Sequence, residues 1–91
     1  MSQAHVDPEA LREFSQVLEQ FTRETREHLG RVSGLLKEMG ETVWQDERHQ
    51  EFSEQFDEVE RLILSATDSI ESEQLPRLHQ LADQAEEYLG A

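Results

Sequence analysis

Four histidines and 21 carboxylates are the residues of this chain that could bind a metal ion. In helical bundles, carboxylate-bridged di-metal sites need Glu-x-x-His motifs on facing helices. The residues three positions before His28 and His79 are Thr and Pro, so neither histidine completes the motif. Asp46 and His49 come near it, but one such pair cannot build the site. The sequence therefore predicts no metal and no cofactor.

Covalent catalysis is not predicted either, because the residues for it are not grouped. A nucleophile needs a base, an orienting third group and a concave pocket, and a short helical hairpin offers little concavity. A run of carboxylates fits a solvated surface or, alternatively, a docking surface for a basic partner. These acids are Glu47, Glu51, Glu54, Asp57, Glu58 and Glu60. We expect a protein that is not an enzyme.

A long amphipathic helix is predicted over residues 8–39. Asp7 can cap its first N–H groups, Pro8 suits the first helical position, and Glu9 favours the positive end of the helix dipole. A heptad seam follows, with flanking apolar residues Val17, Leu29 and Leu36. The seam comprises Leu11, Phe14, Leu18, Phe21, Thr25, His28, Val32, Leu35 and Met39. Its two polar members, at 25 and 28, either set register and partner choice or are simply solvated.

A turn over residues 40–45 is predicted to fold a second helix back against the first. Gly40 can take the left-handed conformation that ends many helices, and Asp46 can cap the next helix. Trp44 either anchors this turn or contacts a partner. The second helix, about residues 46–72, has an apolar row of period three and four. The row comprises Phe52, Phe56, Val59, Ile63, Ala66 and Ile70.

The C-terminal segment, about residues 73–89, is predicted to be helical but out of phase with the preceding row. Its apolar set begins five residues after Ile70 and runs through Leu75, Leu78, Ala82, Ala85 and Leu89. Pro76 clashes with helical geometry at the carbonyl of Ser72. The sequence leaves two alternatives here, a kink or a break in which Ser72 caps a third short helix.

The 91 residues predict one all-α domain, residues 1–91, built as an antiparallel two-helix hairpin. So short a chain buries little surface, and without cysteine it has no disulfides. Oligomerisation is the remaining way to stabilise it, so we expect pairing into a four-helix bundle. The expected interface residues are Phe14, Leu18, Phe21, Val32, Phe52, Phe56, Val59 and Ile63.

The net charge of −13 limits the classes of partner. Residues 1–45 carry eight acids and five bases, while residues 46–91 carry 13 acids and three bases. Phosphate backbones and anionic lipids repel such a chain, so we expect no nucleic-acid binding and no membrane insertion. Neither a long apolar run nor a signal-peptide pattern over Met1 to Glu9 is present. We expect a cytoplasmic protein, or one exported without a cleavable signal peptide.

Two short motifs resemble the WXG (Trp-Xaa-Gly) proteins of type VII secretion. Residues 6–11, Val-Asp-Pro-Glu-Ala-Leu, are similar to the entry of that family's first helix. Trp44-Gln45-Asp46, followed by Phe52, is similar to its turn motif, with Asp46 in place of glycine. Tyr88 is followed by Leu-Gly-Ala and lacks the acidic residue four positions later that completes the family's export signal.

The resemblance implies a homodimer, or a heterodimer with a related helical hairpin, that forms a four-helix bundle. It implies a secreted substrate, a targeting partner, or an adaptor for a larger effector protein. A heterodimer partner would then carry the export signal. The alternative from a different class is an acidic cytoplasmic chaperone or inhibitor that masks a basic partner protein.

Overall fold

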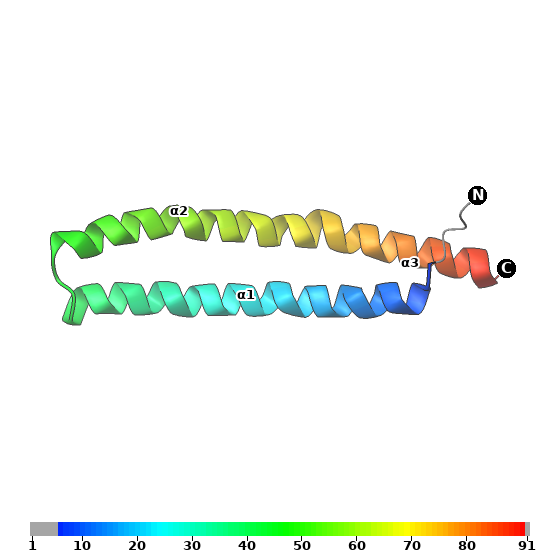
Figure 1. Cartoon of the computed structure of the whole chain (residues 1–91), viewed down its shortest axis with the longest axis horizontal. Coiled ribbons are helices and arrows are strands. Elements are labelled where there is room, and N and C mark those ends of the chain that lie inside the picture. Colours follow the sequence, from blue (N-terminus) through cyan, green and yellow to red (C-terminus); the bar gives the residue numbers. More distant parts are fainter. Residues whose placement is uncertain (1–5, 91) are drawn as a thin grey trace. The chain divides into compact units, whose positions relative to one another are not determined.

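The computed structural model describes residues 6–90, except for the side chains of residues 89 and 90, and shows no strand in this range. The elements, in order, are α1 (Pro8–Thr42), α2 (Glu47–Ser69), the π-helical segment η1 (Ile70–Gln74) and α3 (Leu75–Gly90), as Figure 1 shows. The all-α class with two long helices is therefore confirmed. Two predictions concern parts of the chain that the structure does not describe. One is the lack of a signal-peptide pattern, which involves residues 1–5, and the other is the place of the Leu89 side chain in the C-terminal apolar set.

The predicted start of α1 is confirmed at atomic level. Asp7 Oδ1 accepts a hydrogen bond from the Glu9 N–H at 2.9 Å, and the Asp7 carbonyl accepts one from the Leu11 N–H at 3.1 Å. Pro8 is the first helical residue, where its missing N–H costs nothing. The start of α2 is capped in the same way, because Asp46 Oδ1 accepts from the N–H groups of Arg48 and His49 at 2.9 and 3.2 Å.

The end of α1 corrects the prediction for Gly40. The helix continues to Thr42, and no glycine among the described residues has a positive φ. The N–H groups of Val43 and Trp44 both donate to the Met39 carbonyl, at 3.0 and 2.8 Å, and so end the helix without a left-handed residue. Gly40 instead leaves room for the His49 ring, because a Cβ at this position would lie 2.7 Å from Nδ1 of His49.

The segment η1 explains the loss of apolar phase after Ile70. The Leu75 N–H donates to the Ile70 carbonyl, five residues back, as in a π-helix. A five-residue step therefore completes one turn, which brings half-buried Ile70 and buried Leu75 to the same side. Ser72 does not cap a new helix, since the residue before η1 is Ser69 in ordinary helical geometry and α3 begins at Leu75. The wider turn also accommodates Pro76, which has no N–H to donate.

The described residues belong to two compact units. Unit 1 holds the described residues 6–22 and 69–90, and so contains the first part of α1 with η1 and α3. Unit 2 comprises Arg23–Asp68, in which the rest of α1 and the antiparallel α2 are joined by residues 43–46 (Figure 1).

An arginine of α1 closes each unit on its partner helix. In unit 1, Arg12 Nη2 lies 2.9 Å from Asp83 Oδ1 and 2.6 Å from Glu86 Oε2. In unit 2, Arg26 Nη2 lies 2.7 Å from Asp68 Oδ1. Its Nε also donates to the Thr67 hydroxyl at 3.3 Å. These pairs connect positions more than 40 residues apart in the sequence, so they help to set the register between the helices.

Small and hydroxyl side chains occupy much of the buried surface in both units. Ser15, Thr22 and Thr67 are at most 2% exposed. Each hydroxyl donates at 2.9 Å to a carbonyl three or four residues earlier in its own helix, so burial leaves it paired. The buried apolar residues in the described range are Leu29 in unit 2 and Leu75 and Ala82 in unit 1. Most of the large apolar residues therefore remain outside the buried seam.

Candidate partner-binding face

Unit 2 carries six large apolar side chains that are 40–70% exposed. We call this set the apolar face. On α1 it comprises Val32, Leu35 and Met39, and on α2 it comprises Phe52, Val59 and Leu62. The spacings of three, four and seven residues place each trio along one side of its helix.

The two trios lie on the same side of unit 2. On α1, Leu35 stands one residue before half-buried Leu36, and on α2, Phe52 stands one residue before half-buried Ser53. In an antiparallel pair the two helices are related by an approximate twofold axis across their seam. This axis is perpendicular to the plane that contains both helices. Leu35 and Phe52, each one residue before a position in the seam, therefore point to the same side of that plane. The apolar face is thus shared by both helices.

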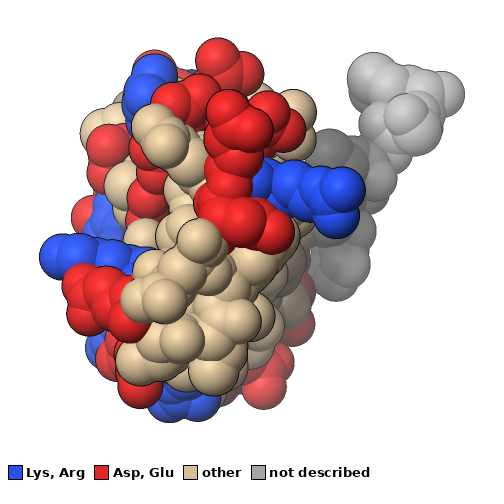
Figure 2. All heavy atoms as spheres, turned by 90° about the vertical axis from the view of Figure 1, so that its left-hand side faces the viewer, with Lys and Arg blue, Asp and Glu red and all other residues tan. Residues whose placement is uncertain are grey.

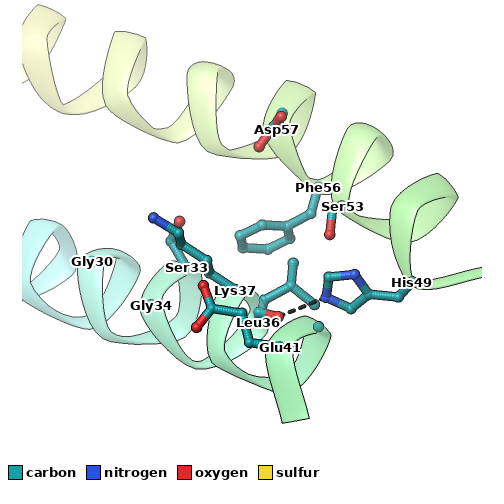
Figure 3. Close-up of a pocket in the computed structure, with 11 residues that line it drawn as sticks. Gly30, Ser33, Gly34, Leu36, Lys37, Glu41, His49, Ser53, Phe56 and Asp57 are labelled. Atoms are coloured by element: carbon teal, nitrogen blue, oxygen red, sulfur yellow. Dashed lines mark hydrogen bonds between the residues drawn. The ribbon is translucent and has the colours of Figure 1, made fainter. Parts of the chain in front are cut away.

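The structure divides the eight predicted interface residues into two groups. Leu18, Phe56 and Ile63 are half-buried, and Figure 3 shows the Phe56 ring projecting into the space between α1 and α2. These three contribute to packing within their own units. The five others are 45–55% exposed: Phe14, Phe21, Val32, Phe52 and Val59. Phe14 and Phe21 belong to unit 1, while the last three belong to the apolar face of unit 2.

Sequence reasoning missed how strongly Leu35, Met39 and Leu62 are exposed. It placed Leu35 and Met39 in the heptad seam of the first helix, with Leu29 and Leu36 flanking this seam, and did not single out Leu62. A usable signal was present in the seven-residue spacing of Ser15, Thr22, Leu29 and Leu36, which marks a second row along α1. This row includes the buried positions, whereas the more hydrophobic row remains accessible. Of the two polar members of the predicted seam, Thr25 is half-buried and His28 is exposed.

Trp44 lies in an aromatic cluster that holds the turn of unit 2. Its ring meets the His49 ring edge-on at 5.1 Å between centroids and the Phe52 ring at 5.9 Å. Phe52 in turn stacks on Phe56 at 6.4 Å. His49 Nε2 lies 2.7 Å from the Leu36 carbonyl, to which it donates. Half-buried Trp44 therefore anchors the turn, and Asp46 caps α2 beside it.

An open groove of about 680 Å³ lies beside Gly30, Gly34 and Phe56 (Figure 3). His49 and Ser53 also line it, and the His49 Nε2–H donates to the Leu36 carbonyl. No group of three or more metal-binding side chains occurs among residues 6–88, where side chains are described.

The acidic run on α2 is mostly solvated. Five of its six members are exposed, and Glu60 is half-buried on the seam side. Within residues 6–90, none of the helices is long and apolar enough to cross a membrane.

No protein-family model, curated protein or solved structure matches this chain.

Proposed function

We propose that the protein is a non-enzymatic pairing module whose apolar face binds a second amphipathic helical hairpin, and that the two complete a four-helix bundle. The observation that carries the proposal is the exposure of six large apolar side chains in a single unit. Contiguous apolar patches of this kind mark interaction sites on water-exposed proteins. Helices offer such rows to other helices, which interdigitate with them at the same spacing.

The type VII-like role remains part of the proposal. A helical hairpin with Trp44 in its turn is the arrangement that the WXG resemblance implies, and pairing is the activity expected of it. In this role the pair would act as a secreted substrate, a targeting partner or an adaptor. The acidic chaperone is the second candidate, and the net charge of −13 favours it. The two differ in whether the native protein leaves the cell, which fractionation of culture medium and cells would decide.

The pairing itself is tested by placing a charge in the apolar face. Leu35 and Leu62 are 53% and 70% exposed, so Leu35→Asp and Leu62→Asp should leave the hairpin folded. In a bundle, either carboxylate would be buried without a partner. We expect affinity to fall about 30-fold or more, equivalent to about 2 kcal/mol. Sedimentation equilibrium over a concentration series, with helicity from circular dichroism, measures both effects.

Gln50→Asp is the matched control, because it adds the same charge to an exposed position of α2 outside the apolar face. It should pair like the native chain. Equal pairing by Leu35→Asp, Leu62→Asp and the native chain would show that the apolar face is not the interface. A native chain that stays monomeric and captures no helical hairpin would refute the module itself.

A further inference from the structure

We infer that the hairpin bound by the apolar face is a different chain with basic residues flanking its own apolar row, rather than a second copy of this one. This inference rests on the proposed function, because it names the chemistry of the partner at the same face. It is carried by the charges of unit 2 and by their positions around the face.

Unit 2 is strongly acidic as a whole. Residues 23–68 hold 12 acids and six bases. One of the six bases, Arg26, already pairs with Asp68 inside the unit. The remaining carboxylates are mostly exposed, so their charge acts on whatever approaches. A second copy would bring the same excess of negative charge, whereas a basic chain would neutralise it.

The charges nearest the apolar face are also more acidic than basic. On α1, Glu38 and Arg31 stand three and four residues from Leu35 and therefore flank it. On α2, Arg48 stands four residues before Phe52, and Glu58 stands four before Leu62, with Glu51 one heptad before Glu58. The flanks thus hold three acids and two bases.

Figure 2 looks onto the turn end of unit 2. Uncharged side chains gather at the centre of this view, and acidic and basic side chains both border them. Val43, in the turn, is 77% exposed, and its N–H donates to the carbonyl of Met39, a member of the apolar face. Apolar contact with charged flanks is how paired helices select partners, because flanking charges attract or repel while the apolar row provides the affinity. Acidic flanks select a basic partner.

Pairing of the native chain with a basic-flanked copy of itself tests this selectivity. The copy carries Glu38→Lys, Glu51→Lys and Glu58→Lys, which changes its flanks from three acids and two bases to five bases. Its apolar face is unchanged, so only charge distinguishes it from the native chain. The control copy carries Glu41→Lys, Glu54→Lys and Asp57→Lys. These are three exposed acids off the face, on the same two helices, and they give the same change in net charge.

We expect the native chain to bind the basic-flanked copy at least about tenfold more tightly than it binds itself at low salt, and the difference to shrink as salt rises. The control copy should gain much less. Binding is measured by fluorescence anisotropy of the labelled native chain, with circular dichroism of each copy to verify folding. If a copy is unfolded when free, Glu51→Lys alone replaces the triple variant and should keep the direction of the effect.

Two outcomes would overturn the inference, and they differ in what they leave standing. Self-pairing as tight as pairing with the basic-flanked copy, at low salt, would show that a second copy suffices and would leave the proposed function intact. An equal gain from both copies would show that net charge acts without regard to the face, and would also refute the basic-flanked partner. No association in any mixture would remove the pairing module together with the inference.

Discussion

The two units use similar contacts but close over very different lengths of chain. In unit 2, α1 and α2 are joined directly by residues 43–46. In unit 1, Arg12 meets Asp83 and Glu86, which lie 71 and 74 residues later. Closing a long loop costs more conformational entropy than closing a short one. We therefore expect unit 2 to form first, because a formed unit 2 shortens the loop that unit 1 must close.

The two units also differ in their buried and aromatic contacts. The buried apolar side chains in the described range are Leu29 in unit 2, and Leu75 with Ala82 in unit 1. Unit 2 adds the aromatic cluster around Trp44 and the hydrogen bond from His49 to the Leu36 carbonyl. The comparison indicates that unit 2 is the more self-sufficient part, and it is also the part that carries the apolar face.

The largest expected effect comes from removing the buried leucine of either unit. Leu29 and Leu75 are each 7% exposed, so Leu29→Ala and Leu75→Ala should each cost about 2–4 kcal/mol of unfolding free energy. The two substitutions should differ in which unit loses protection from hydrogen exchange. Leu75→Ala should raise amide hydrogen exchange in unit 1 alone, whereas Leu29→Ala should raise it in both units, because unit 1 depends on unit 2 for closure. Exchange measured peptide by peptide with mass spectrometry distinguishes these patterns.

Symmetric results would break the comparison. If Leu75→Ala exposed the amides of unit 2 as much as those of unit 1, the chain would unfold as one cooperative body. If Leu29→Ala left unit 1 protected, closure of unit 1 would not require unit 2. An exposed leucine of the apolar face, Leu62, gives the matched control, since Leu62→Ala removes the same atoms from a 70% exposed position. It should change the exchange of the free monomer little.

The turn of unit 2 provides the second prediction. A Cβ on Gly40 would meet the His49 ring, with Nδ1 and Nε2 at 2.7 Å, whereas a Cβ on Gly34 would meet nothing within 4 Å. Gly40→Ala should therefore displace His49 from the Leu36 carbonyl and destabilise the chain by about 1–3 kcal/mol. Gly34→Ala should stabilise it by up to about 1 kcal/mol, because alanine favours the helix. Thermal unfolding of both variants measures the difference.

Trp44 fluorescence gives this prediction a local readout, since the ring contacts His49. Its emission should change in Gly40→Ala and stay native in Gly34→Ala. A Gly40→Ala chain with native stability and native emission would show that the His49 ring has room to move aside, and that unit 2 does not rely on this turn cluster.

Periodicity and capping residues predicted much of the fold because they act locally. Asp7 and Asp46 cap the two long helices as their positions indicated. The five-residue step after Ile70 marked a real disturbance, but its solution as a π segment depends on the hydrogen bond from Leu75 to Ile70. The prediction that Gly40 ends the helix in a left-handed conformation was wrong. A glycine near the end of a helix looks the same in the sequence whether it supplies that conformation or makes room for a neighbouring ring.

The orientation of α1 could not be predicted in the same way. Large apolar side chains such as Phe14 and Phe21 define the more hydrophobic row, so they suggested the seam. The structure instead buries Ser15 and Thr22, whose hydroxyls are satisfied within their own helix. Which row packs inside the hairpin depends on how both helices fit together, and one helix alone does not contain that information. The apolar face is the consequence of this choice.

The smallest expected effects come from the arginines that close the two units. Arg26→Met should cost about 0.2–1 kcal/mol, since its pairing with Asp68 is largely solvated and Thr67 keeps a hydrogen bond to its own helix. Hydrogen bonds to Glu86 and Asp83 raise the pKa of Arg12. The charged guanidinium therefore stabilises the folded chain fully at pH values below the ordinary pKa of arginine. This stabilisation is lost only as the pH rises through the raised pKa. Over ordinary pH Arg12 stays charged.

Salt is therefore a better probe of the Arg12 pair than alkaline pH. Raising the salt concentration screens the charges of Arg12, Asp83 and Glu86, so the native chain should lose protection of unit 1 with salt, and Arg12→Met should show a smaller loss. Arg26→Met should instead weaken both units, because unit 1 closes on a formed unit 2. Hydrogen exchange at low and high salt separates the two. If Arg26→Met loses protection in unit 2 alone, unit 1 keeps its long loop closed through its own contacts. That result would contradict the order of assembly inferred from loop length.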